Sequence, residues 1–205
     1  RSRLSVDYTP DMSLVAGTAC TGDVTQDCEA NVYVWDTVHG DLLLNLVDSN
    51  YDATYYDNES IIRFSDDGNY VIALSCFAYG EMPNPPFCEH SGIRIWDVRE
   101  AESLRDTRSA YDRMSDDFDE STLPEPLTLE PIVMIVDAAE AEYNISFDTL
   151  MQDAGTMLVA TSDFNGTFFY EVDLSTGEAT IIHEVDDAQF PHFSPTGDYV
   201  TMSRS

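Results

Sequence analysis

One pattern recurs four times along this chain: a short strand, a turn built from Ser, Pro, Asp and Gly, and a second strand rich in Val, Leu, Ala and Thr. Polar turn residues between two β-rich runs of this length are typical of a β-hairpin. The four copies are VDYTPDMSLVAGTAC (6–20), IRFSDDGNYVIALSC (62–76), ISFDTLMQDAGTMLVATS (145–162) and PHFSPTGDYVTMS (191–203). Because no such unit can bury both of its faces, we expect the copies to stack on one another.

A third strand follows each of the first three hairpins, in NVYVWDTVHGDLLLNL (31–46), GIRIWDVREAESL (92–104) and GTFFYEVDLSTGEATIIHEV (166–185). Its alternating apolar residues end in Asp36, Asp97 or Asp173, and a turn and an outer-strand candidate come next. Four antiparallel strands per repeat, arranged radially, form a β-propeller blade. The sequence therefore predicts an all-β propeller.

The repeats resemble the WD40 family. FSDDGNYVIALS…GIRIWDV and FSPTGDYV match its strand-turn-strand and Trp-Asp signatures, and TSDFNGTFFYEVDLSTGE matches its third-strand segment with Val172-Asp173 in place of Trp-Asp. The resemblance gives Asp163 the tight-turn position of the family. No Gly-His dipeptide opens a repeat, so the buried Asp-His-Ser-Trp network of the family is not implied. The chain is more similar to a divergent, bacterial or TolB-like propeller.

The repeat period divides the chain into about three and a half blades. We expect blade one at about 1–53, blade two at 54–104, an acidic loop at 105–131 between blades two and three, blade three at 132–188 and a partial blade four at 189–205. Within blade three, 132–137 is predicted to be a buried outer strand. Because three and a half blades cannot close a ring, we expect this chain to be part of a larger protein.

The charge of the chain restricts its partners. There are 39 acidic residues against nine basic ones, all of them Arg, which gives a net charge of -30. Nucleic acid and anionic membranes are excluded as partners because they require clusters of Lys and Arg. No apolar run approaches the ~20 residues of a membrane span. Such a surface suits a salty or calcium-containing exterior, or simply confers solubility.

The four cysteines form two close pairs, Cys20 with Cys28 and Cys76 with Cys88. Each pair joins the end of a second strand to the start of a third, at the same place in successive blades. Four cysteines allow three connectivities, but neither pair has the CxxC spacing of a zinc or redox site. We therefore expect two loop disulfides and an extracytoplasmic location, secreted, periplasmic or at the cell surface. A pair of reactive thiols is the alternative.

The densest anionic patch lies in SDDFDE (115–120) and the neighbouring Asp112. Calcium binds several carboxylate and carbonyl oxygens on a flexible loop, although the Gly that an EF-hand needs is missing here. A solvated loop and a docking site for a basic partner are the alternatives. No other cofactor is expected. The candidate calcium ligands are Asp112, Asp116, Asp117, Asp119 and Glu120.

Structural roles account for most of the remaining conspicuous residues. Trp35 and Trp96 occupy equivalent positions in the third strands, where we expect them to pack between blades. Asp36, Asp97, Asp163 and Asp173 are expected to have structural roles, Asp163 as the residue of a tight turn. The sequons at Asn58, Asn144 and Asn165 are candidate glycosylation sites, of which Asn165 is predicted to be the most accessible.

No catalytic residues are predicted. His39, His90, His183 and His192 lie in different repeats without a metal-binding spacing, although His183 and His192 could meet where blades three and four join. No GxSxG, P-loop or GxGxxG motif occurs. The inner strands are expected to supply no convergent set of His, Arg and Asp, and only Arg63 lies close to one.

These observations predict a non-enzymatic, extracytoplasmic binding or scaffold module with protein partners, as part of a larger protein or assembly. The alternative is a propeller hydrolase whose active-site residues lie mostly outside this segment. A third interpretation is a sensor domain fused to a transporter or receptor. Propellers serve many functions, so the fold does not choose between these.

Overall fold

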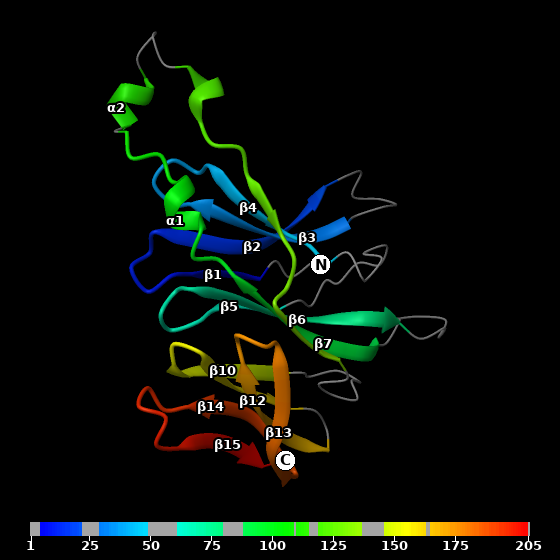
Figure 1. Ribbon diagram of the computed structural model, residues 1–205. Coiled ribbons are helices and arrows are strands. Elements are labelled where there is room, and N and C mark those ends of the chain that lie inside the picture. The colour runs from blue at the N-terminus through cyan, green and yellow to red at the C-terminus, as the bar shows by residue number, and fades with distance from the viewer. Residues whose placement is uncertain are drawn as a thin grey trace.

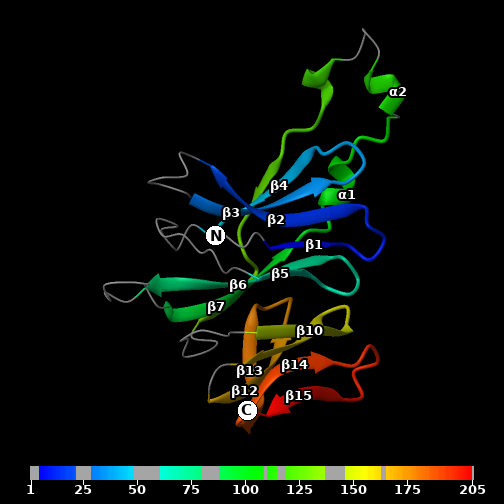
Figure 2. The same cartoon turned by 180° about the vertical axis from the view of Figure 1, so that it is seen from behind.

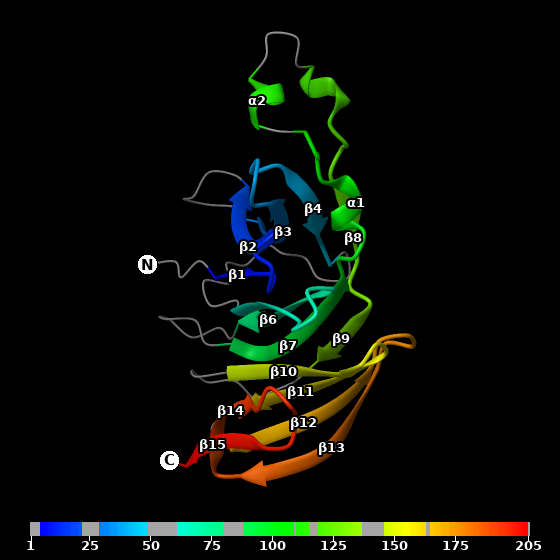
Figure 3. The same ribbon diagram turned by 90° about the vertical axis from the view of Figure 1, so that its left-hand side faces the viewer.

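The described residues form four β-sheets that follow one another in chain order, from the blue sheet in the upper part of Figure 1 to the red hairpin near its bottom. The same arrangement is seen from behind in Figure 2 and from the side in Figure 3. Each sheet is a blade of a β-propeller, and the fold class predicted from the repeats is confirmed. The computed structural model describes residues 5–21, 29–48, 61–79, 88–108, 110–114, 119–136, 146–162 and 165–204.

Blade one is an antiparallel meander with one added strand. Its order is β1 (Val6–Tyr8), β2 (Leu14–Thr21), β3 (Glu29–Asp36) and β4 (Leu42–Leu46). The added strand β8 (Leu127–Leu129) pairs with β4 in parallel, from far along the chain. The outer edge of blade one is therefore covered by a segment that the repeat pattern does not assign to it.

Blade two has the order β5 (Ile61–Phe64), β6 (Tyr70–Tyr79), β7 (Cys88–Asp97) and β9 (Val133–Val136). Its fourth strand, β9, pairs antiparallel with β7 from Gly92↔Val136 to Ile95↔Val133. The apolar run at 132–137 is thus an outer strand, as predicted, but it belongs to blade two. The predicted start of blade three at 132 is wrong for this reason.

The segment between β7 and β9 is an insertion within blade two and not a loop between blades. It begins with α1 (Ala101–Leu104), where the sequence suggests an outer strand, so the predicted end of blade two at 104 is also wrong. It continues through α2 (Ala110–Arg113), the 3-10 helix η1 (Glu120–Thr122) and β8. The part that carries α2 and η1 extends beyond blade one, at the top of Figures 1 and 3.

Blade three is the most regular sheet. It contains β10 (Ser146–Asp153), β11 (Thr156–Ser162), β12 (Gly166–Asp173) and β13 (Glu178–Asp186), which pair antiparallel in chain order. The described part of blade four is a single hairpin of β14 (Ala188–Phe193) and β15 (Val200–Arg204). This arrangement agrees with the prediction of three blades and part of a fourth.

The alternation of side chains along β6 explains why the blades stack. Val71 and Ala73 belong to the core between blades one and two, whereas Ile72 and Leu74 belong to the core between blades two and three. Successive residues of a strand point to opposite faces of the sheet. A strand with apolar residues at every position therefore needs a neighbouring blade on each side.

The hairpin turns after β1 and β5 share a hydrogen-bond pattern, in which a Ser or Thr hydroxyl donates to the Asp two residues later and accepts from a backbone N–H. In blade two, Ser65 Oγ donates to Asp67 Oδ1 (2.6 Å) and accepts from the backbone N–H of Tyr70 (3.0 Å). The fourth turn residue adopts positive φ, at 73° for Gly68 and 59° for the equivalent Met12 of blade one. Glycine adopts this conformation without steric cost, whereas a side chain does not.

Candidate functional site

An open cavity of about 240 Å³ lies where the inner strands of blades one, two and three approach one another. Strands β1, β5 and β10 and the turns that follow β1 and β5 form its walls. The cavity is lined by Asp7, Tyr8, Pro10, Arg63, Phe64, Ser65, Asp66, Asp148 and Thr149. We call it the axial cavity, because the inner strands of a propeller surround its central axis.

Hydrogen bonds between blades hold two of the cavity carboxylates in place. The backbone N–H of Phe64 in blade two donates to Asp7 Oδ2 of blade one (2.8 Å). In the same way, the backbone N–H of Phe193 in blade four donates to Asp148 Oδ2 of blade three (2.8 Å). Each carboxylate therefore helps to join its blade to the next one while it lines the cavity.

Arg63 and Asp66 bring charges of both signs from blade two. The exposed guanidinium of Arg63 donates through Nη1 to the carbonyl oxygen of Ile62 (3.1 Å). The pKa of Asp66 is raised, first by partial burial and then by repulsion from Asp148 and Asp67. The cavity thus holds a carboxylate that takes up a proton more readily than an ordinary Asp side chain, and Arg63 lines the same cavity.

These positions correct one expectation from the sequence. The inner strands do supply a convergent set of charged residues, because Asp7, Arg63, Asp66 and Asp148 line one cavity. His192 lies beside this set, with its Nδ1 3.7 Å from Asp148 Oδ2. The residues come from three repeats, and the sequence alone does not show which residues of different inner strands meet around the axis.

The Asp residues that end the third strands shape the turns that follow them. Asp173 Oδ1 accepts hydrogen bonds from the backbone N–H groups of Ser175 (2.8 Å) and Thr176 (3.1 Å), and its pKa is lowered by these bonds together with one from the Ser175 hydroxyl. Asp97 pairs with Arg99, and this pairing lowers the pKa of Asp97. Asp163 lies outside the described residues.

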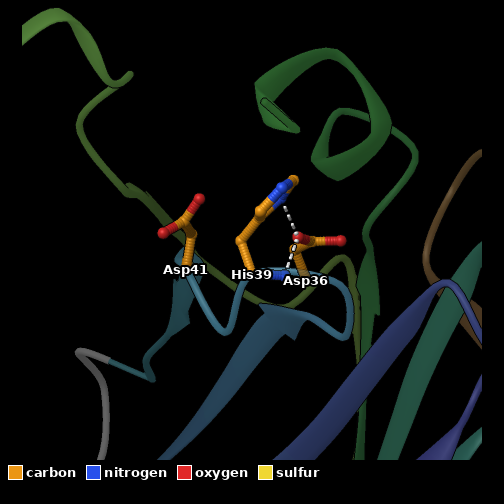
Figure 4. Close-up of side chains that lie close together, drawn as sticks. All are labelled: Asp36, His39 and Asp41. Carbon is orange, nitrogen blue, oxygen red and sulfur yellow. Dashed lines mark hydrogen bonds and ion pairs between the residues drawn. The ribbon is translucent and has the colours of Figure 1, made fainter. Parts of the chain in front are cut away.

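Asp36, the equivalent residue in blade one, belongs to a second group of charged side chains (Figure 4). One potential ligand atom from each of Asp36, His39 and Asp41 lies within 4.8 Å of the others. Arg105 Nε donates to Asp36 Oδ1 (3.2 Å), and Arg113 Nη1 donates to Asp41 Oδ1 (2.9 Å). We call Asp36, His39 and Asp41 the β3–β4 turn cluster.

The pKa of Asp36 is lowered although its side chain is only 1% exposed. Burial acts in the opposite direction and raises the pKa. Hydrogen bonds from the backbone N–H groups of His39 and Val38 and from the side chains of His39 and Arg105 outweigh this effect. The carboxylate is therefore ionised in the folded protein at neutral pH.

The two Trp residues occupy equivalent positions, as predicted, but they differ in burial. Trp35 pairs with Val15 and Trp96 with Val71 in the β2–β3 and β6–β7 registers. Trp96 is 2% exposed in the core between blades one and two. Trp35 is half-buried and lies against Tyr33, with ring centroids 5.6 Å apart.

The predicted disulfides remain predictions, because none of the four cysteine side chains is within the described structure. Cys28 lies outside the described residues altogether. The backbone places Cys20 opposite Ala30 in the β2–β3 hairpin, and Cys76 opposite Ser91 and Cys88 opposite Tyr79 in the β6–β7 hairpin. Cys20 thus lies near the end of β2 and Cys88 begins β7, whereas Cys76 lies inside β6.

The acidic loop and the sequons are only partly described. Asp116, Asp117, Asn58 and Asn144 lie outside the described residues, as does the side chain of Glu120. Asp119 Oδ1 accepts from the backbone N–H (3.0 Å) and the hydroxyl (2.7 Å) of Ser121. Asp112 and Asn165 are both exposed. Calcium binding and glycosylation therefore remain predictions.

The histidines of blades three and four do not form a metal group among the described side chains. His183 contacts the ring of Phe169 (centroids 6.0 Å apart), and His192 lies near Asp148. The side chain of His90 is not described. Among the described histidines, His39 is the one whose ring lies within reach of two carboxylates, Asp36 and Asp41. A signal for this group was present in WDTVHGD, which places two Asp residues and a His within one turn.

Comparisons with known proteins support no assignment to a family. The sequence matches no family model and no curated protein. Solved structures that resemble it include the hydrazine synthase of Kuenenia stuttgartiensis (11% identity, 96% of this chain and 48% of that chain, TM-score 0.49). The Dos1 propeller (13%, 97% and 38%, TM-score 0.49) and the β-propeller domain of the trilobed protease of Pyrococcus furiosus (16%, 92% and 44%, TM-score 0.42) resemble it similarly.

The chain spans less than half the length of each of these proteins. The propeller fold therefore rests on the strand order and the cores between blades. None of the helices in the described part of the chain has the length and apolar character of a membrane span.

Proposed function

We propose that this chain is a non-enzymatic binding module of a larger extracytoplasmic protein or assembly, and that its axial cavity receives a basic segment of a protein partner. The axial cavity carries this proposal. Three carboxylates and one guanidinium line it, so its own charge is negative, in a chain with a net charge of -30. Complementary charge steers a basic partner toward such a surface.

The hydroxyl of Ser65 in the cavity wall is already hydrogen-bonded, and this favours binding over covalent catalysis. Ser65 is a lining residue, but its hydroxyl is buried and bonded to Asp67 and to the backbone N–H of Tyr70. A nucleophilic serine needs a free hydroxyl beside a general base.

The structural similarity of the repeats to one another, together with their Trp-Asp signatures, further supports a divergent propeller of the WD40-like kind.

The test is site-specific photocrosslinking in the full-length protein. A photoreactive amino acid replaces Tyr8, which lines the axial cavity, or, as a control, Ile182 on the outer strand β13, which is 52% exposed. We expect capture of a basic protein from position 8 and not from position 182, and less capture when Asp66→Asn and Asp148→Asn remove two charges. Equal capture from both positions, or capture unaffected by the charge change, would refute the proposal.

A hydrolase is the second candidate, and the raised pKa of Asp66 beside Asp148 favours it. A carboxyl group with a raised pKa can act as a general acid beside a second carboxylate that acts as a general base. Hydrolysis of peptide, glycoside or phosphate ester substrates by the full-length protein, lost in Asp66→Asn, would establish this function in place of simple binding.

The extracytoplasmic location is tested through the cysteines. Thiol titration of the unfolded, unreduced protein is expected to find no free thiol, because disulfides form in oxidising compartments. Four free thiols would remove the argument for this location.

A further inference from the structure

The β3–β4 turn cluster presents an unsatisfied histidine in a rigid setting. The turn is closed by hydrogen bonds from Gly40 N–H to the carbonyl oxygen of Asp36 (3.0 Å) and from Asp36 N–H to that of Asp41 (2.9 Å). The backbone N–H of His39 also donates to Asp36 Oδ2 (2.8 Å). His39 stands between the two Asp residues in this turn (Figure 4).

The contact with Asp36 determines which ring nitrogen of His39 carries the hydrogen. Nδ1 lies 3.1 Å from Asp36 Oδ2, and a carboxylate oxygen accepts hydrogen bonds, so we assign the hydrogen to Nδ1, which donates to it. In the neutral imidazole, Nε2 is then the nitrogen with the free lone pair. Metal-binding histidines are commonly oriented by a carboxylate in this way.

Nε2 of His39 has no partner in the described structure. The His39 side chain is only 6% exposed, and Nε2 is buried without a hydrogen bond. A buried polar atom without a partner costs about 1–3 kcal/mol, so native structures rarely leave one. A ligand that accepts the lone pair would remove this cost.

We propose that the β3–β4 turn cluster binds a divalent transition-metal ion of the Zn²⁺ class, with His39 and Asp41 as ligands and Asp36 as the residue that orients the imidazole. One ring nitrogen of His39 and one carboxylate oxygen of Asp41 lie within 4.8 Å of each other, so the two side chains can share an ion after small movements. One imidazole with carboxylates is a donor set that suits Zn²⁺ better than Mg²⁺ or Ca²⁺, which prefer oxygen ligands only.

Arg113 competes with the ion for Asp41. Its Nη1 and Nη2 both donate to the Asp41 carboxylate, and its Nε donates to Asp106 Oδ2 (2.8 Å). Ion binding requires Arg113 to release Asp41, while Asp106 can retain the guanidinium. Because Arg113 ends α2, the ion and the docked position of α2 oppose each other, and by linkage each weakens the other.

The test is calorimetric titration of the full-length protein with Zn²⁺, in a constant excess of Ca²⁺ that occupies the non-specific carboxylate sites of this acidic chain. The wild type is expected to bind one tight equivalent of Zn²⁺ that His39→Gln weakens at least about tenfold. Arg113→Gln should instead tighten binding several-fold, because it removes the competitor. His183→Gln, which changes an exposed histidine of β13, should leave the tight site unchanged.

A measurement on the wild type alone tests the site even if the variants fail to fold. In the wild type, long-range ¹H–¹⁵N spectra of the imidazoles should show the His39 Nε2 resonance shift when Zn²⁺ is added, in the presence of Ca²⁺. Equal Zn²⁺ affinity in the wild type and His39→Gln, or an unshifted Nε2 resonance, would overturn the site. Unchanged affinity in Arg113→Gln would overturn the competition with α2.

Discussion

Blades one and two carry the same Trp-Asp pair at the end of the third strand, yet the two pairs are buried in opposite ways. In blade two, Trp96 is 2% exposed, whereas the Asp97 side chain is 28% exposed. In blade one, Trp35 is half-buried, whereas the Asp36 side chain is 1% exposed. The motif fixes the position of these side chains in the strand but not their surroundings.

The neighbours of each blade explain the difference. Trp96 faces blade one, and its Nε1 donates to the carbonyl oxygen of Val47 just after β4 (3.1 Å). Trp35 lies on the face of blade one that points away from blade two, beside Gly17 and Tyr33. Asp36 is covered by the blade-two insertion, whose Arg105 follows α1 and reaches it.

The largest effect that the comparison predicts is on the tryptophans. Trp96→Ala should lower the free energy of unfolding by about 3–5 kcal/mol, because it leaves a cavity in the core between two blades. Trp35→Ala should cost only about 1–2 kcal/mol, since a half-exposed ring buries less apolar surface. Denaturant unfolding of the full-length protein measures both. Equal losses would show that the two rings have equivalent surroundings after all.

The aspartates should show the reverse order, with the larger loss in the free energy of unfolding in blade one. Asp36→Asn removes the charge that pairs with Arg105 and should cost about 2–3 kcal/mol, because the partly buried guanidinium loses its buried carboxylate partner and keeps the exposed Glu102. Asp97→Asn should cost less than about 1 kcal/mol, since Arg99 is exposed and screened by solvent. The same unfolding measurement at neutral pH compares them.

The acid limb of the stability curve checks the cause of this effect. The pKa of Asp36 is lower in the folded protein than in the unfolded chain, where it is about 3.9. The folded state therefore binds fewer protons, and the contribution of Asp36 is complete above that value and is lost as the pH falls through the folded pKa. The stability gap between the wild type and Asp36→Asn should begin to narrow at about pH 4 and close only below the folded pKa of Asp36. A gap that persists below that pH would mean that packing and not charge is responsible.

Much of this architecture could be predicted because the repeat is a local signal. The hairpins, the third strands and the positions of Asp36, Asp97 and Asp173 at the ends of those strands follow from residues that are close in the sequence. The outer strand of blade two could not be placed, because an insertion separates β7 from β9 and pairing across it is a long-range choice. Strand β8 is harder still, since three residues carry no alternation that would assign them to blade one.

The candidate sites were less predictable than the fold. Asp7, Arg63 and Asp148 come from three repeats and meet only when the blades stack. The proximity of Asp36, His39 and Asp41 could be inferred because the three residues are close in the sequence. The contacts of Arg105 and Arg113 with them could not, because both arginines come from the insertion. Local spacing therefore identified turn residues, whereas the charges that compete for them depend on tertiary contacts.

The smallest predicted effect uses the hairpin turns of the same two blades. Met12 has φ of 59° where blade two has Gly68 at 73° and blade four has Gly197 at 74°. Met12→Gly should raise the free energy of unfolding by about 0.5–1 kcal/mol, because a left-handed side chain is strained and Met12, 64% exposed, buries little surface. Gly68→Ala is the matched control and should be destabilising, with a Cβ only 3.2 Å from Thr9 Cγ2. A loss of stability in Met12→Gly would mean that contacts of the methionine side chain stabilise the protein by more than its backbone strain destabilises it. The turns of blades one and two would then share their hydrogen bonds but not the preference for glycine at the fourth position.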